Sequence, residues 1–387
     1  MPKLLVLADD FTGSLDTGVQ FAKAGISTTV LFSNFDEQAI ANCDTQLLVL
    51  DLESRHDAPH VAYQKVFEIS KKALARGVKH IYKKTDSALR GNIGAELSGL
   101  LDATSENALE FIPAFPKNGR TTKGGVHFVN GAKVADSVFG KDPFNPVRHS
   151  FVPDIIAEQS QVSVSLDENL KVPHICVHDA QTESDLAQIA KSLKNKTLIA
   201  GCAAFAEYLP EILELAPDST ERKGASKNAK ILLVSGSVND ITLEQLRQAG
   251  KKHEIFTLDA NECDITNAMS QKGIAIISSA TCGKKPDFEN LPKEKIEQLR
   301  LETADKIAQT ACALFESLQP DMLAIFGGDT LIQIVRRLGC TKITPLYEIS
   351  SGTVLCRAKN AACEFLLVSK SGGFGEKDIV EKIADSC

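Results

Sequence analysis

Short apolar runs rich in valine, isoleucine and leucine alternate along this chain with longer amphipathic segments. This alternation is typical of βα units built on a mainly parallel sheet. The runs expected as strands are 3–8, 27–32, 46–51, 79–83, 109–112, 174–178, 197–201, 230–235, 273–279, 321–326 and 363–369. The segments with apolar residues at helical spacing are 15–25, 60–76, 92–102, 181–194, 240–250, 294–317, 330–338 and 375–385. The predicted fold class is therefore α/β.

A polar stretch from Pro217 to Asn228 interrupts the alternation and has the composition of a surface linker. The βα rhythm stops before this stretch and starts again after it. We therefore predict two α/β domains with mainly parallel sheets, residues 1–216 and 230–387, joined by a linker over 217–229. A length of 387 residues is enough for each domain to bury its own core.

The charge balance narrows the classes of ligand. The chain carries 43 Lys and Arg against 50 Asp and Glu, a formal net charge of −7, which disfavours nucleic acid but is compatible with a local basic pocket for a small anion. No apolar run reaches the roughly 18 residues that span a bilayer. Because Met1 to Leu7 is too short for a signal peptide, we expect a cytoplasmic protein without a membrane partner. The 10 cysteines form no C-x-x-C pair, which indicates reduced thiols.

Two strand ends in the first domain carry charged and hydroxyl side chains, at the edge where α/β sheets bind ligands. Strand 3–8 runs into Asp9-Asp10-Phe11-Thr12-Gly13-Ser14, and strand 79–83 runs into Lys84-Thr85-Asp86-Ser87-Ala88-Leu89-Arg90. These carboxylates, cations and hydroxyls suit an anionic, hydroxylated ligand. The alternatives are a plain helix cap at the first turn and a solvated charged loop at the second.

Two further segments of the first domain are candidates for the same ligand. Arg55 follows strand 46–51 and is a possible guanidinium for an anion. The basic, glycine-rich stretch 115–125 precedes the hairpin signal Asn130-Gly131, and it is either a substrate loop or a solvated surface loop.

Three strand ends in the second domain carry glycines and hydroxyls before an expected helix. They are Ser235-Gly236-Ser237, Gly327-Gly328-Asp329-Thr330 and Lys370-Ser371-Gly372-Gly373-Phe374-Gly375. Backbone N–H groups in such turns can hold phosphates where a Cβ would crowd them, and we expect positive φ angles at the glycines of the turn Lys370 to Gly375. Neither G-x-x-x-x-G-K-S/T nor G-x-G-x-x-G occurs, so both common nucleotide fingerprints are missing.

The runs Ala8 to Gly18, Lys83 to Gly94, Gly327 to Thr330 and Lys370 to Gly375 resemble the four-carbon acid sugar kinase family over essentially the whole chain. The resemblance implies an N-terminal sugar-acid domain, a C-terminal nucleotide domain, and ATP-dependent phosphorylation of the terminal (4-) hydroxyl of threonate, erythronate or 3-oxo-tetronate. The chain departs from the family pattern at Gly201 to Ala204 and around Ser350 to Gly352. The sequence therefore leaves the particular acid open.

The resemblance also implies roles for single residues. Sugar-acid binding falls on Asp10, Arg55, Lys84, Thr85, Asp86 and Ser87, and ATP binding on Ser235, Gly327, Gly328, Asp329, Thr330 and Gly372. The same turns add Asp9 and Arg90 to the acid site, and Ser237, Gly373 and Gly375 to the nucleotide site.

Phosphoryl transfer also needs Mg²⁺ on the phosphates and a group that accepts the hydroxyl proton. Asp10 is the candidate base, with Asp86 and Asp329 as alternatives, and Asp329 is also the candidate metal ligand. We expect the active site in the cleft between the domains and a possible homodimer. The competing interpretation is a non-catalytic sugar-acid or nucleotide sensor, which would not need both the acidic turns and the glycine turns. A nicotinamide-dependent oxidoreductase is disfavoured by the missing fingerprint.

Overall fold

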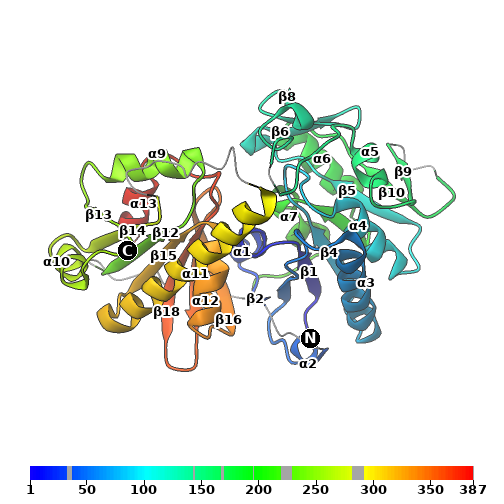
Figure 1. Cartoon of the computed structure of the whole chain (residues 1–387). Helices are drawn as coiled ribbons and strands as arrows, with labels where there is room; N and C mark the ends of the chain where they lie inside the picture. Colours follow the sequence, from blue (N-terminus) through cyan, green and yellow to red (C-terminus); the bar gives the residue numbers. More distant parts are fainter. Residues whose placement is uncertain are drawn as a thin grey trace. The chain divides into compact units, whose positions relative to one another are not determined.

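The computed structural model describes residues 1–32, 37–142, 144–166, 170–194, 196–218, 229–280 and 292–386. The chain divides into two compact units, Met1–Ser219 (unit 1) and Thr220–Cys387 (unit 2), both of which mix helices and strands (Figure 1). Residues 219–228 of the expected linker 217–229 lie outside the described residues. The α/β fold class predicted from the sequence is confirmed.

Unit 1 is built on a parallel sheet with the strand order β2-β3-β1-β4-β11-β5-β10-β9. Its strands are β1 (Leu4–Ala8), β2 (Thr28–Phe32), β3 (Leu47–Asp51), β4 (His80–Lys84), β5 (Ala108–Ile112), β9 (Ser163–Ser165), β10 (His174–Val177) and β11 (Leu198–Gly201). Its helices are α1 (Phe11–Lys23), α2 (Glu37–Ala41), α3 (Pro59–Ala75), α4 (Ile93–Asp102), α5 (Val152–Ala157), α6 (Glu183–Ser192), α7 (Ala203–Ala206) and α8 (Leu209–Ile212).

Helix α1 begins four residues before the predicted segment 15–25, and the reason lies in its cap. The side chain of Asp10 accepts a hydrogen bond from the Gly13 backbone N–H at 3.1 Å, which satisfies one of the free donors at the helix start. The helix therefore starts directly after the strand-end carboxylates and holds them at the edge of the sheet.

The hairpin predicted at Asn130-Gly131 is present. Strands β6 (Arg120–Lys123), β7 (Val126–Val129) and β8 (Ala132–Lys133) form a small antiparallel sheet, with the short helical turns η1 (Pro116–Asn118) and η2 (Val134–Asp136) beside it in sequence. Asn130 and Gly131 both have positive φ angles, 49° and 82°, as a two-residue hairpin turn requires.

Unit 2 has a mixed sheet with the order β13-β14-β12-β15-β18-β17-β16. Its strands are β12 (Ile231–Ser235), β13 (Ile255–Phe256), β14 (Ile274–Ser278), β15 (Met322–Phe326), β16 (Lys342–Ser350), β17 (Thr353–Lys359) and β18 (Glu364–Lys370), and its helices are α9 (Asp240–Ala249), α10 (Glu262–Lys272), α11 (Lys293–Leu318), α12 (Gly328–Arg337) and α13 (Ile379–Asp385). The pairs β16–β17 and β17–β18 are antiparallel, and the other pairs are parallel.

The antiparallel strands β16 and β17 were not among the predicted elements. Ser351 and Gly352 connect them, and Gly352 has a φ of 69°, a conformation that glycine adopts without steric cost. The dipeptide was the available signal for this hairpin, but the proline at position 345 weakens the strand pattern before it.

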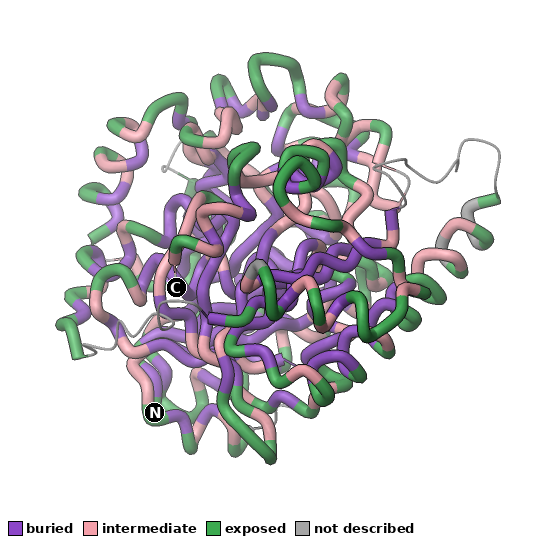
Figure 2. The backbone as a smooth tube through the Cα atoms, turned by 90° about the vertical axis from the view of Figure 1, so that its left-hand side faces the viewer, coloured by how far each residue is buried: buried purple, intermediate pink, exposed green. Residues whose placement is uncertain are grey.

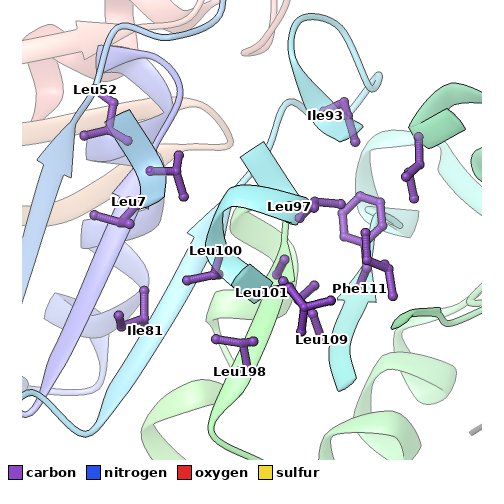
Figure 3. Packing of buried hydrophobic residues seen from close by; sticks show 14 of the residues in the cluster. Leu7, Leu52, Ile81, Ile93, Leu97, Leu100, Leu101, Leu109, Phe111 and Leu198 are labelled. Atoms are coloured by element: carbon purple, nitrogen blue, oxygen red, sulfur yellow. The ribbon is translucent and has the colours of Figure 1, made fainter. Parts of the chain in front are cut away.

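The central parallel strands of both sheets are buried on both faces, as is usual where helices cover a parallel sheet. In unit 1 the residues of β1, β4 and β5 that point to one face, such as Leu7, Ile81 and Phe111, pack against α4 (Figure 3). Residues of α3 belong to the same core. In unit 2 the corresponding core lies between the sheet and helices α9 and α13. Figure 2 shows the buried segments concentrated in the interior and the exposed ones at the periphery. Of the helices described, none has the length and apolar composition needed to cross a membrane.

Candidate active site

The carboxyl ends of β1, β3 and β4 bring the charged turns of unit 1 together. Ala8 at the end of β1 is in register with Asp51 of β3 and with Lys84 of β4, so the three strands end at the same level. The turns that follow carry the side chains that the sequence indicated as an acid site. They are Asp9, Asp10, Arg55, Lys84, Thr85, Asp86, Ser87 and Arg90.

Arg55 is the centre of this ionic cluster. Its Nη2 lies 2.7 Å from Asp9 Oδ2 and 2.8 Å from Asp10 Oδ1, and its Nη1 donates to Asp10 Oδ2 at 3.0 Å. Lys84 Nζ lies 3.4 Å from Asp9 Oδ1 and 3.7 Å from Asp10 Oδ1. The two cations therefore hold the adjacent carboxylates of the first turn in one place.

Asp86 is held by a second arginine. Arg90 Nε and Nη2 donate to the two oxygens of Asp86, both at 2.9 Å, a bidentate pair of the strong type. The backbone N–H groups of Ala88 and Arg90 also donate to Asp86 Oδ2. Asp142, which the sequence did not indicate, lies 3.4 Å from Arg90 Nη1.

Asp9, Asp10 and Asp86 differ in how far their side chains are buried, and this limits the roles that each can have. The side chain of Asp10 is 24% exposed, compared with 2% for Asp9 and 9% for Asp86. Burial works to raise the pKa of Asp10, but the charges of Arg55 and Lys84 outweigh it and lower the pKa to about 2. Burial likewise opposes ionisation of Asp86, and Arg90 and Arg55 still hold its pKa well below the usual range. Asp10 is therefore an ionised carboxylate and the most exposed of the three.

A fully buried ion pair lies next to the ionic cluster around Arg55, and it was not predicted from the sequence. Lys83 Nζ lies 3.0 Å from Glu96 Oε2 and donates to the Lys84 carbonyl at 2.7 Å. The other oxygen of Glu96 accepts a short hydrogen bond from Ser54, the residue before Arg55. The pair thus connects the β3 turn and the β4 turn through helix α4.

Two glycines allow the cations to reach the cluster. A Cβ on Gly13 would overlap the Lys84 ammonium and the Asp10 carboxylate. A Cβ on Gly91, which has a φ of 88°, would lie 2.9 Å from Arg55 Cγ. Both positions lack space for a side chain because the charged groups pass directly over the backbone.

The stretch 115–125, left open from the sequence, contributes to the site through β6 and β7. His127 Nε2 donates to the Ser87 carbonyl at 3.0 Å, and its Nδ1 accepts from Thr122 Oγ1 at 3.0 Å. The guanidinium groups of Arg90 and Arg120 lie over the Phe139 ring, 5.1 and 5.8 Å from its centroid. The small sheet therefore fixes the β4 turn and brings a further arginine beside Arg90.

The buried His127 predicts a pH dependence of stability. Burial lowers the pKa of His127 to about 4, whereas an unfolded histidine titrates near 6.5, so the unfolded chain binds the extra proton between these values. The free energy of unfolding therefore falls by about 3 kcal/mol in all as the pH drops through this range. In urea titrations from pH 7.5 to 4, His127→Gln should lose less stability than the parent by about this amount. His60→Gln, at an exposed position in α3, is the control and should follow the parent. Parallel curves for the parent and His127→Gln would contradict the prediction.

Unit 2 brings its three glycine turns together at the carboxyl ends of β12, β15 and β18. A Cβ on Gly327 would lie 3.3 Å from the Ser237 backbone N, and one on Gly372 would lie 2.8 Å from Ser237 Oγ. A Cβ on Gly236 would overlap Thr330 Oγ1. The turns indicated by the sequence thus pack against one another, with Gly327 directly before helix α12.

The expected positive φ angles occur at only some of these glycines. Gly327 has a φ of 110° and Gly375 a φ of 85°, whereas Gly372 and Gly373 lie outside this region. The expectation was wrong for these two. At Gly372 close packing against Ser237, and not an unusual backbone angle, leaves no space for a side chain, whereas a Cβ on Gly373 would make only an ordinary contact with Asn239. Asp329 lies in the first turn of α12, 58% exposed, with its Oδ2 3.1 Å from Arg300 Nη1.

A cavity of about 240 Å³ lies beside these turns, and the sequence did not indicate it. Ser278 and Ser279 line it at the end of β14, and Ser279 donates its backbone N–H to the Ser235 carbonyl at 3.0 Å. The remaining lining residues are Thr257, Leu258, Asp259, Thr303 and Lys306. A cavity adjoining a set of glycine turns can take an uncharged group attached to a phosphate.

Known proteins resemble both units. One family model, described as a sugar-binding N-terminal domain, matches residues 4–209, and another, described as a nucleotide-binding C-terminal domain, matches residues 232–380. A solved Haemophilus influenzae structure covers 98% of this chain and 99% of its own with a TM-score of 0.72 at 20% identity, which shows a shared fold. The two domains, together with curated relatives that are named kinases, define a phosphotransferase that acts on a hydroxyl group.

Curated relatives narrow this class to one family. A D-threonate kinase of Salmonella typhimurium is 28% identical over 96% of this chain and 95% of its own length. A D-erythronate kinase of Heliobacterium modesticaldum is 31% identical over 64% of this chain and 60% of its own length. A 3-oxo-tetronate kinase of Haemophilus influenzae is 25% identical over 97% and 98%. The chain belongs to the four-carbon acid sugar kinase family.

Proposed function

We propose that this kinase transfers the γ-phosphoryl group of ATP, bound with Mg²⁺, to the terminal hydroxyl of a four-carbon sugar acid. The observation that carries the proposal is the partly exposed, ionised Asp10 held by Arg55 and Lys84. The names of the relatives support threonate, erythronate and 3-oxo-tetronate as the candidate acceptors. Because the cytoplasm supplies ATP, we also propose that the protein acts there. The net charge of −7 favours a small acid over nucleic acid as the ligand.

We assign the carboxylate of the sugar acid to Arg90 and the neighbouring Arg120. Arg55 directs its donors to Asp9 and Asp10, so its role is to hold those carboxylates. Arg90 is 28% exposed, compared with 12% for Arg55, and shares the Phe139 ring with Arg120. Arg90 gives its Nε and Nη2 to Asp86, so it would hold the substrate carboxylate through its remaining Nη hydrogens together with Arg120. Two cations beside one ring suit an anionic group.

The hydroxyl groups of the acid are assigned to Asp10, Thr85 and Ser87. Within the described residues Thr85 Oγ1 is fully buried and has no hydrogen-bond partner, which supports a ligand hydroxyl beside it. Asp10 would accept a hydrogen bond from the terminal hydroxyl and orient its oxygen. Since phosphoryl transfer passes through a loose transition state, orientation matters more than early removal of the proton, and a carboxylate of low pKa suffices. Asp86 positions Arg90 in this scheme.

The phosphates of ATP are assigned to the three glycine turns of unit 2. Backbone N–H groups at Ser235 to Ser237, at Gly327 to Thr330 and at Gly372 to Gly375 would bind their oxygens, and the start of helix α12 adds its dipole. The tight contacts that a Cβ would make with Ser237 at Gly327 and Gly372 show that the three turns pack close together, which supports convergence of their N–H groups on one ligand. Asp329 is the candidate ligand for Mg²⁺, which prefers carboxylate oxygens and would neutralise charge on the phosphates.

A substrate panel tests the proposal. ADP release is measured with purified protein, ATP and Mg²⁺ against the D and L forms of threonate and erythronate and against 3-oxo-tetronate, with glycerate as a shorter control. We expect one four-carbon acid to exceed the others in kcat/KM by at least about tenfold, because buried polar groups discriminate strongly against misplaced hydroxyls. ADP release that no four-carbon acid stimulates would contradict the proposed substrate class.

A further inference from the structure

Lys370 is a fully buried lysine at the end of β18, where the turn Ser371 to Gly375 begins. Its Nζ donates to Thr242 Oγ1 and to the Ser371 carbonyl, both at 3.1 Å, and lies 4.9 Å from the centroid of the Phe326 ring. The two hydrogen bonds use both N–H groups of a neutral amine. The third N–H group of an ammonium would lie over the aromatic ring. The site accommodates both the neutral and the charged form.

No carboxylate among the described residues lies within ion-pair distance of this amine. Strand β15 carries no charged side chain, and those of β17, Arg357 and Lys359, belong to its far end. Helix α9 carries Asp240 and Glu244, of which Glu244 pairs with Arg247, and Glu376 after the turn pairs with Lys382. In unit 1, by contrast, the buried Lys83 has its counter-charge in Glu96. An isolated buried ammonium is costly unless an anion compensates it.

The position of Lys370 shows where such an anion would bind. Its carbonyl accepts the Gly327 backbone N–H at 3.0 Å, and a Cβ on Gly375 would lie 3.5 Å from its Cε. Thr242, which accepts from the amine, donates to the Gly372 carbonyl at 2.8 Å. Lys370 therefore lies directly behind two of the turns that we assign to the phosphates.

We propose that Lys370 supplies the positive charge that balances the phosphates of a bound nucleotide, and that it takes up a proton when the nucleotide binds. This inference rests on the assignment of the glycine turns to ATP. The role of Lys370 differs from that of the glycine turns, whose backbone would contact the nucleotide directly. The Lys370 side chain is buried inside the unit and would act by its charge.

The direction of the pH effect follows from burial. Burial lowers the pKa of Lys370 to about 7, and a nearby polyanion favours the charged form and raises it again. At pH 8 a group with a pKa near 7 is about nine-tenths neutral, so nucleotide binding should take up close to one proton. At pH 6 it is already charged, and the uptake should fall to about one tenth of a proton. Affinity therefore increases as the pH falls from 9 toward 7.

Calorimetric titration of ADP into the full chain tests the proposal. At pH 8, titrations in buffers of different ionisation enthalpy report the protons taken up, and the parent protein should show close to one more than Lys370→Met. We expect Lys370→Met to raise the Kd of ADP by at least about tenfold, because the charge-assisted contribution is lost. Lys359→Met, an exposed lysine on β17, is the matched control and should behave as the parent.

The outcomes separate this inference from the proposed function. Thermal unfolding shows whether Lys370→Met is folded, and Lys370→Arg, which keeps a permanent charge, should bind ADP without proton uptake. ADP binding by the parent with no proton uptake, or equal uptake in the parent and Lys370→Met, would overturn the role of Lys370 while leaving ATP as the substrate. Absence of ADP binding to the parent would instead contradict the nucleotide assignment itself.

Discussion

Asp10→Asn should lower kcat by about 100-fold or more while KM for the sugar acid changes by less than about threefold. The carboxylate is partly exposed, is ionised throughout the physiological range because its pKa is about 2, and is held by Arg55. An amide lacks the negative charge that would hold the hydroxyl and receive its proton as the new bond forms, and its NH₂ group would face the guanidinium unfavourably. Steady-state kinetics with the acid identified by the panel measure both constants.

Asp154→Asn is the matched control, since Asp154 is exposed in helix α5 of the same unit. Its kinetic constants should equal those of the parent. The thermal unfolding of Asp10→Asn must be recorded beside the kinetics, because Asp10 also caps α1. A folded Asp10→Asn variant that keeps kcat within about threefold would exclude Asp10 from the transition state.

Arg55→Ala should affect both stability and substrate binding. It removes the nearer of the two cations that Asp9 and Asp10 share, and leaving buried carboxylates short of a partner costs about 3–5 kcal/mol of unfolding free energy. Among folded molecules, KM for the sugar acid should rise by at least about tenfold, because the carboxylates of Asp9, Asp10 and Asp86 then leave excess negative charge beside an anionic substrate. KM for ATP should stay within about twofold, since the glycine turns belong to unit 2.

Arg148→Ala serves as the control, because Arg148 is an exposed arginine of unit 1. Urea titrations followed by circular dichroism give the change in unfolding free energy, and kinetics at a temperature where the variant is folded give the two KM values. Equal increases in both KM values would point to a general folding defect, and Arg55 would then be removed from the acid site.

The sequence predicted the elements of the two sheets well wherever a local pattern carried the information. Runs such as 46–51 and 321–326 became strands within one residue of the predicted bounds, because apolar periodicity is decided by which side chains must be buried. The charged and glycine-bearing turns were also visible, since they follow directly on such strands. Strands β16 and β17 were missed because their signal lies in pairing across a hairpin and not in one apolar run.

The sequence by itself determined the α/β class, the strand ends that bear charged side chains and glycines, and the family. Only the tertiary structure decided which charges meet: that Arg55 pairs with Asp9 and Asp10, that Lys83 finds Glu96, and that His127 reaches the Ser87 carbonyl. It also decided that Lys370 is buried without a carboxylate among the described residues. Burial and pairing depend on contacts between residues distant in the chain, and these set the pKa of each group, whereas periodicity and turn composition are local properties.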